Sequence, residues 1–186
     1  YFAARDQFGT KFPRKWSHLT MGKGSNNRLG LTYGLNEVVN YFLWNKAGVP
    51  APHTLYFHFR VVDGATEAPD QYNGDFWGLN WLQEDYDGAF LDTHGLAKGN
   101  LYKLIKASFT KNLAADMVGQ RRYQGPFGVT NGMDGAAIQT GLLAPQTADW
   151  IRANVNVDAW YRYHAVCEAV RHYDFWPDAN KNAAWY

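Results

Sequence analysis

The sequence contains very little cysteine, no long apolar run and almost no excess of charge of either sign. Its single cysteine, Cys167, excludes an intrachain disulfide and a cysteine-rich zinc module, and the helical pattern around it predicts a buried side chain. No apolar run approaches the roughly 18 residues of a membrane span. Lys and Arg number 18 and Asp and Glu 17, and this balance argues against nucleic acid or an anionic membrane surface as the partner.

The chain is instead rich in aromatic side chains. Trp, Tyr and Phe make up 17% of its 186 residues, whereas charged residues make up only 19%. A chain of this length buries about 70% of its unfolded surface, which predicts one globular domain stabilised largely by aromatic residues. The chain begins at Tyr1 without an initiator Met or the basic and apolar regions of a signal peptide, and we expect a cut or processed start.

The spacing of apolar residues predicts a helix over residues 34–47. These residues recur at intervals of three and four, and Gly48 and Pro50 supply the stop. Glu37 lies in the first turn, where an acid near the positive end of the helix dipole is ordinarily solvated. The alternative is that Glu37 points into a cleft.

Alternating apolar residues predict two strands, over residues 54–62 and 76–83. Asn73-Gly74 provides a turn signal before the second strand, so we expect an antiparallel pair. The alternation in the first strand predicts one buried and one wetter face. The buried face would hold Leu55, Phe57, Phe59 and Val61, and the wetter face Tyr56, His58 and Arg60.

Shorter elements and one region without periodicity follow these strands. A hinge is predicted at 84–88, because its acids lack the spacing of a calcium loop. A short helix at 90–96 and a strand at 99–105 come next, and Lys103 on that strand either contacts a ligand or extends to solvent. Glycine and proline interrupt residues 106–148, where we expect an irregular insertion.

The last predicted helix runs from its capping residue Asn156 to about Tyr173 and delivers Asp174 to its C-terminal end. A carboxylate is disfavoured at the negative end of the helix dipole, so a bound cation or a base should compensate it. Asp178 and Asn182 follow in the same loop, whose oxygens are typical of half of a metal and phosphate site. The alternative is a helix end closed by ordinary Asp and Asn turns.

Five short motifs occur in order between about residue 30 and residue 186. They are Gly48-Val49-Pro50-Ala51-Pro52, Gly74-Asp75-Phe76-Trp77-Gly78-Leu79, Glu84, Gly99-Asn100-Leu101-Tyr102-Lys103, and Asp174 with Lys181-Asn182. Together they resemble the CotH family, atypical protein kinases first associated with bacterial spore coats. The resemblance implies an α+β, atypical protein-kinase-like fold, with a small antiparallel sheet and helices, incomplete at both termini. Under it, residues 1–105 form a sheet-rich lobe and hinge, 106–148 an insertion and 149–186 a helical lobe.

The resemblance also implies ATP and Mg²⁺ as cofactors and assigns roles to individual residues. Asp174 is the expected catalytic carboxylate, which orients or deprotonates the substrate hydroxyl, and Asn182 is the expected ligand of Mg²⁺, with Asp178 as the alternate carboxylate. The nucleotide is expected to contact Glu37, Glu84, Tyr86 and Lys103. A phosphate-contacting lysine would precede Tyr1, and a second metal-binding Asp would follow Tyr186.

The implied reaction is transfer of the ATP γ-phosphate to Ser or Thr of a surface or coat protein, at an extracellular or spore-surface location. Two alternatives come from other classes of protein. The first is a catalytically silent structural component of an extracellular coat or filament, with the aromatic surface as its interface and a homo-oligomer as its form. The second is a carbohydrate-binding module that uses Trp77 and Trp81 as exposed aromatic residues.

Overall fold

The computed structural model describes residues 18–22, 34–104, 113–172 and 183–186. These residues form an α+β fold of short helices and two three-stranded antiparallel sheets, with strand orders β1-β3-β2 and β5-β4-β6. The elements in chain order are β1 (Leu19–Gly22), α1 (Leu35–Lys46), β2 (Thr54–Val61), the 3-10 turn η1 (Gln71–Asn73), β3 (Asp75–Glu84), α2 (Gly88–Thr93), β4 (Leu101–Leu104), α3 (Leu113–Gln120), β5 (Arg121–Tyr123), α4 (Met133–Leu143), α5 (Ala148–Asn154), α6 (Val157–Ala169) and β6 (Ala183–Trp185).

The described residues fall into two compact units. The first unit lies within Tyr1–Leu43 and Ala51–Asp85, and the second within Trp44–Pro50 and Tyr86–Tyr186. Each sheet therefore belongs to one unit. None of the helices in the described part of the chain is long and apolar enough to cross a membrane.

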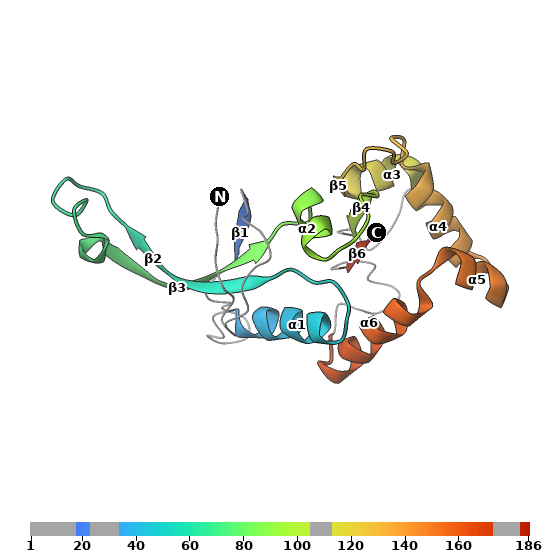
Figure 1. The fold of residues 1–186 in the computed structure, drawn as a ribbon, viewed down its shortest axis with the longest axis horizontal. Helices are drawn as coiled ribbons and strands as arrows, with labels where there is room; N and C mark the ends of the chain where they lie inside the picture. The colour runs from blue at the N-terminus through green and yellow to red at the C-terminus, as the bar shows by residue number, and fades with distance from the viewer. Residues whose placement is uncertain (1–17, 23–33, 105–112, 173–182) are drawn as a thin grey trace. The chain divides into compact units, whose positions relative to one another are not determined.

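A hairpin of β2 and β3 dominates the first unit, with η1 in the loop that connects the two strands (Figure 1). The predicted antiparallel pairing is confirmed, with a register from Thr54 opposite Gln83 to Val61 opposite Asp75. The register shifts between His58 and Arg60, because β3 has one residue more than β2 at this point.

The far end of the hairpin departs from the predicted faces of the first strand. Gly78 lies in the bulge with φ of 103°, a conformation that residues other than glycine rarely adopt. Val61, predicted to be buried, is the last residue of β2 and is 36% exposed.

Trp81 on β3 is the central side chain of the first unit. It is only 6% exposed, so the expected pair of exposed Trp77 and Trp81 is wrong. Gly22 and Gly34 both press against its indole ring, and a Cβ atom built on either would lie 2.0 Å from a ring atom. Tyr41 of α1 also contacts the ring, with 6.5 Å between centroids. The two glycines thus provide the space in which the largest side chain of the sheet is buried.

Helix α1 confirms the helix predicted over residues 34–47. Val38 and Trp44 of this helix are buried, and the helix ends at a left-handed glycine, Gly48, with φ of 78°. The amide of Gly48 donates to the carbonyl of Asn45 and the amide of Val49 to that of Trp44. This is the glycine stop that the sequence predicted.

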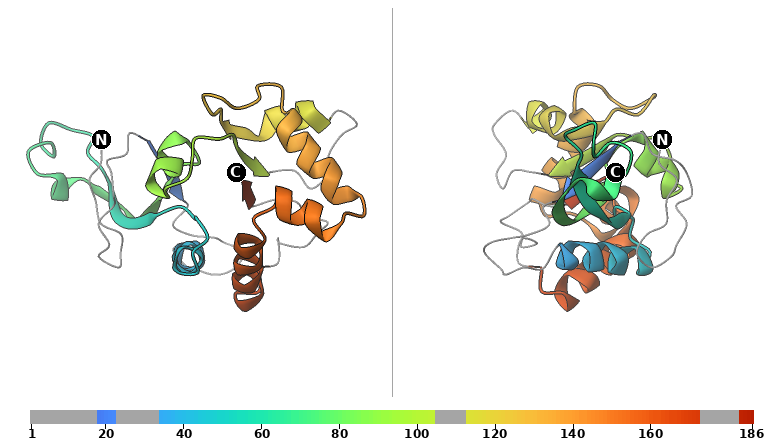
Figure 2. Two further views of the ribbon diagram at one scale, coloured as in Figure 1. Left: turned by 45° about the vertical axis from the view of Figure 1, so that its right-hand side comes forward. Right: turned by 90° about the vertical axis from the view of Figure 1, so that its left-hand side faces the viewer.

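The second unit contains the sheet β5-β4-β6 and helices α2 to α6. Helices α3 and α4 lie side by side, with Met117 and Ala136 buried against Tyr102 of β4 (Figure 2). A second cluster consists of Phe90 and Leu91 of α2 with Leu101 of β4. These two clusters form the core around β4.

The expectation of an irregular insertion at 106–148 is wrong for its described part, which contains α3, β5 and α4. The glycines of α4 are places of close approach and not breaks. A Cβ atom on Gly135 would lie 2.5 Å from Cε of Met117, and one on Gly141 would lie 2.2 Å from the Trp150 ring. Sequence patterns treat glycine as a helix breaker, whereas here its lack of a side chain allows the helices to pack.

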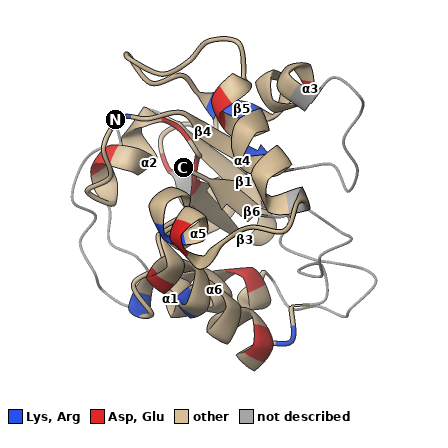
Figure 3. Ribbon diagram, turned by 90° about the vertical axis from the view of Figure 1, so that its right-hand side faces the viewer, with Lys and Arg blue, Asp and Glu red and all other residues tan. Residues whose placement is uncertain are grey.

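Helix α6 begins as predicted, because the side chain of Asn156 accepts a hydrogen bond from the amide of Ala159 at 3.0 Å. It ends at Ala169, earlier than the predicted Tyr173, and Arg171 adopts a left-handed φ of 52° just after it. Cys167 is buried, as predicted. Acidic and basic residues are interspersed along α5 and α6 (Figure 3), as on an ordinary solvated helix surface.

Candidate functional site

Glu84, the last residue of β3, is completely buried. One carboxylate oxygen accepts a hydrogen bond from the His53 amide at 3.3 Å and lies 3.1 Å from Nδ1 of the same histidine. The Glu84 amide in turn donates to the His53 carbonyl at 2.9 Å. A buried carboxylate needs such partners, and here they fasten the end of β3 to the residue that precedes β2.

The two acids that follow Glu84 are also used locally. Asp85 accepts a hydrogen bond from the hydroxyl of Thr20 on β1. Asp87 caps α2 by accepting hydrogen bonds from the amides of Ala89 at 2.7 Å and Phe90 at 3.0 Å. Asp85 and Asp87 therefore both have local hydrogen-bond partners, and the boundary between the two compact units falls between Asp85 and Tyr86.

Tyr86 and Lys103, two of the residues expected to contact the nucleotide, lie together in the second unit. The ammonium nitrogen of Lys103 is 5.2 Å from the centroid of the Tyr86 ring, which is a cation–π contact. The Tyr86 ring also packs on Phe90, with 5.1 Å between centroids. Lys103 is half-buried on β4, so its charge is held at a defined place beside the segment that follows the hinge.

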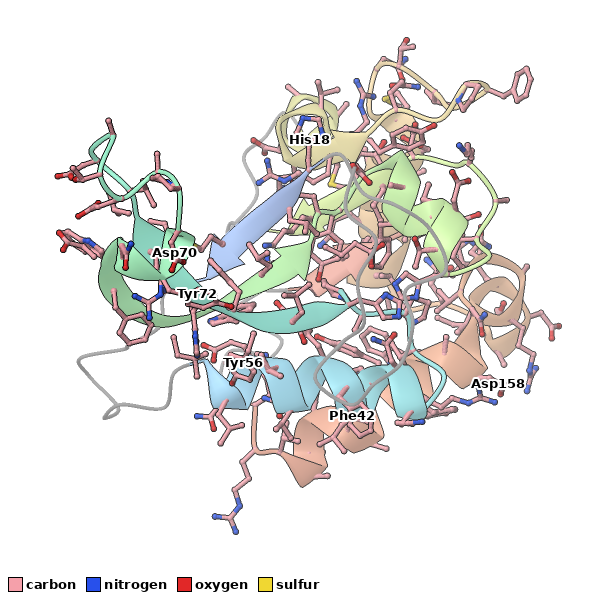
Figure 4. All side chains as sticks on the ribbon, turned by 60° about the vertical axis from the view of Figure 1, so that its left-hand side comes forward. His18, Phe42, Tyr56, Asp70, Tyr72 and Asp158 are labelled. Atoms are coloured by element: carbon pink, nitrogen blue, oxygen red, sulfur yellow. The ribbon has the colours of Figure 1, made fainter. Side chains whose placement is uncertain are left out.

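Glu37 lies in the first turn of α1 and its side chain is exposed. Burial, and next the negative charge of Glu37, raise the pKa of Tyr41 to about 12. The same two causes raise the pKa of Tyr56, whose ring lies beside α1 (Figure 4). The charge of Glu37 therefore acts on tyrosines of both α1 and β2.

A buried hydrogen-bond network around Asn100 was not predicted from the sequence. The Asn100 amide nitrogen donates to a carboxylate oxygen of Asp134 at 2.7 Å and to the Val129 carbonyl at 2.8 Å. The Tyr102 hydroxyl donates to the other oxygen of Asp134 at 2.6 Å. Both donors belong to the motif Gly99-Asn100-Leu101-Tyr102-Lys103, and the acceptor lies in the first turn of α4.

The same network holds the loop between β5 and α4. The Gly125 amide donates to the Asn100 side-chain oxygen at 2.9 Å, and a Cβ atom on Gly128 would lie 2.2 Å from that oxygen. At its tip, Phe127 is fully exposed, with a relative exposure of 101%. Asn100 and Tyr102 of the motif thus position a loop. Lys103 is the charged residue of the same motif, and it lies beside Tyr86.

The network predicts an acid-dependent contribution to stability. Partial burial alone would raise the pKa of Asp134, but hydrogen bonds from Tyr102, Asn100 and two backbone amides outweigh it and lower that pKa. A lowered pKa gives stability that is complete above the ordinary carboxyl value, about 3.9, and is lost as the pH falls through the folded-state value. The stability difference between wild type and Asp134→Asn should therefore shrink as the pH is lowered from about 5 to about 2.

Urea unfolding at several pH values measures this difference. Asp149→Asn is the matched control, because the Asp149 side chain is 97% exposed and its stability difference should stay small at every pH. A difference for Asp134→Asn that does not change over this range would contradict the role given to the carboxylate.

Asp174, Asp178 and Asn182 lie outside the described residues. Of the predicted site residues, the structure therefore brings together Tyr86 and Lys103 and shows Glu37 and Glu84 in the first unit. No sequence signal connects Asn100 with Asp134, since the two residues are 34 positions apart and the motif that contains Asn100 does not extend to Asp134.

A family model described as CotH kinase protein matches residues 34–186. This chain belongs to the CotH family. The match confirms the resemblance seen in the motifs and covers both the Glu84 segment and the Lys103 motif. No curated protein matches the chain. Membership in CotH indicates a kinase-like role.

Proposed function

We propose that this CotH protein is an atypical protein kinase that transfers the γ-phosphate of ATP to Ser or Thr of a surface or coat protein. The observation that carries the proposal is the CotH match over residues 34–186, which includes the Asp174 segment. The side chains of Glu84, Asp85 and Asp87 all have local hydrogen-bond partners, which supports a connecting role for their segment. The backbone next to Tyr86 is then the part of this segment suited to contact the adenine ring of ATP.

Asn182 and Asp178 have side-chain oxygens of the kinds that a magnesium ion takes as ligands. Mg²⁺ prefers carboxylate and amide oxygens, and Asn182 and Asp178 would hold it in the proposed site. When bound, the ion neutralises charge on the phosphates of ATP. In the proposed reaction the Ser or Thr oxygen forms a bond to the γ-phosphorus while the bond from that phosphorus to ADP breaks, and the hydroxyl proton passes to the Asp174 carboxylate.

Lys103 is the described residue best suited to the phosphates. It is a cation on a short strand whose neighbours Asn100 and Tyr102 are fixed by Asp134, so its backbone position is well defined. Contact with Tyr86 holds its ammonium group on the side of the hinge. A fixed cation near developing phosphate charge is the main means of catalysis in phosphoryl transfer.

Replacing Lys103 by methionine should weaken binding of ATP with Mg²⁺ about tenfold or more, because a charge-assisted contact to phosphate is lost while the aliphatic stem is retained. Calorimetric titration of the full-length protein measures the change. Lys98→Met is the control, since Lys98 is exposed and pairs with Asp92. This variant should bind nucleotide as wild type does. Equal affinity in Lys103→Met would remove this residue from the proposed site.

A further inference from the structure

The loop between β5 and α4 presents one fully exposed aromatic side chain. Phe127 has a relative exposure of 101%, and Val129, two residues further along, is 44% exposed. The loop protrudes from the second unit in both views of Figure 2. Removing a phenyl ring from water is strongly favourable, so a ring that stands entirely in water has much to gain from an apolar partner.

The tip of this loop is a tight turn from Gly125 to Gly128. The Gly128 amide donates to the Gly125 carbonyl at 3.0 Å, and the ring of Pro126 restricts the backbone between them. The turn packs closely on the segment before β4, since a Cβ atom on Gly125 would lie 2.4 Å from the carbonyl oxygen of Lys98. Phe127 is therefore held at the end of a fixed turn, which lowers the entropy lost when it binds.

The polar groups of the turn already have partners within the protein. The carbonyls of Gly125 and Gly128 accept hydrogen bonds from the Gln124 side chain at 3.2 and 2.8 Å. The Gly125 amide donates to the Asn100 side chain at 2.9 Å, and Pro126 has no amide hydrogen. This internal bonding lowers the cost of moving the tip into an apolar medium. Protein partners ordinarily contribute hydrogen bonds across an interface, so the turn is better suited to lipid.

Two arginines lie directly before the loop. Residues 117–133 contain Arg121 and Arg122 and no acid. The Arg121 guanidinium donates to the carbonyls of Val129 at 3.3 Å and Thr130 at 2.9 Å, so its charge lies at the loop. Arg122 is exposed, and neither arginine forms an ion pair in the described part of the chain. The loop thus combines an apolar tip with positive charge that no acid compensates.

We propose that this loop binds the surface of an anionic membrane. Phe127 would enter the boundary between headgroups and acyl chains, while Arg121 and Arg122 would contact the lipid phosphates. The balanced charge of the whole chain argues against such a partner, but attraction to a membrane falls off within a Debye length and so depends on the local charges. The proposal does not depend on catalysis, because the loop would hold the second unit at a membrane whatever reaction the chain performs.

Co-flotation of the full-length protein with lipid vesicles tests the proposal. We expect binding to vesicles of equal parts phosphatidylcholine and phosphatidylglycerol, with an affinity that falls as salt is added, and binding at least about fivefold weaker to phosphatidylcholine alone. Phe127→Ala should lower the affinity for the anionic vesicles about tenfold, because the burial of one phenyl ring is lost. Arg122→Gln should lower it about fivefold and leave binding to phosphatidylcholine unchanged.

Phe127→Trp is the rescue variant, since tryptophan is favoured at the membrane interface, and it should bind as tightly as wild type does. Tyr161→Ala is the matched control, because Tyr161 on α6 is 68% exposed and lies far along the chain from the loop. It should leave the affinity unchanged. Both of the replaced side chains are exposed, so circular dichroism should show the wild-type fold in each variant.

A wild-type protein that does not bind the anionic vesicles would overturn the proposal, as would an unchanged affinity in Phe127→Ala. Equal binding to the two kinds of vesicle would also overturn it, because the arginines would then contribute nothing. Self-association that Phe127→Ala abolishes, without binding to vesicles, would replace the membrane by a second copy of the chain. Loss of phosphate transfer with vesicle binding intact would bear only on the kinase proposal.

Discussion

Replacing Asp174 by alanine in the full-length CotH protein is expected to lower phosphate incorporation from ATP about a hundred- to ten-thousandfold. This is the range by which a positioned general base accelerates a reaction. The alanine variant has no group to orient the acceptor hydroxyl or to take its proton, whereas ATP should still bind. The measurement is incorporation of labelled γ-phosphate into protein with Mg²⁺ present, together with the affinity for ATP.

Asp158→Ala is the matched control for this experiment, since Asp158 is an exposed acid in the first turn of α6. It should leave incorporation unchanged, and both variants should melt cooperatively near the wild-type temperature. Incorporation in Asp174→Ala equal to that of wild type would falsify the assignment of the base. If the wild-type protein binds no nucleotide at all, the catalytically silent coat component becomes the better description.

Trp81→Ala should have the largest effect on stability, a loss of about 3–5 kcal/mol in the free energy of unfolding. Trp81 is 6% exposed, and it is enclosed by Gly22, Gly34 and Tyr41. Two of these neighbours are glycines, which have no side chains that could move into the cavity. The cost should therefore be near the upper end for this type of substitution. Urea unfolding followed by fluorescence and circular dichroism measures it.

Trp77→Ala is the control from the same strand. Trp77 is 66% exposed, so its removal should change the free energy of unfolding by about 0.5 kcal/mol or less. Similar losses in the two variants would mean that the burial of the Trp81 indole is not what stabilises the first unit.

The long elements of the fold could be predicted because their patterns are local. Helix α1, the strands β2 and β3 and their pairing, and the Asn156 cap all follow from residues within one or two turns or strands. Strands of three or four residues, such as β1 and β6, contain too few side chains for a period to be recognised. Val61 is exposed because it is the last residue of β2, and the alternation of that strand does not reveal where its buried part ends.

The residues of the candidate site likewise divide into those that the sequence predicted and those that it did not. Tyr86 and Lys103 were predicted from the resemblance to the CotH family, and the structure shows them in contact. The partners of Asn100 lie 25 to 34 residues away, in a region whose glycines concealed the helices that carry them. Asp134 could not have been selected, because a carboxylate in the first turn of a helix is ordinarily explained by the helix dipole. Asp174, Asp178 and Asn182 remain predictions.

The close packing of Gly135 on Met117 and of Gly141 on Trp150 has a consequence for how this sequence can change during evolution. Within each pair the glycine leaves the space that the larger side chain fills, and a protein interior is packed too densely to hold a second side chain there. A larger residue at 135 therefore requires a smaller one at 117, and the same exchange connects 141 with 150. We therefore expect the two residues of each pair to change together among related sequences.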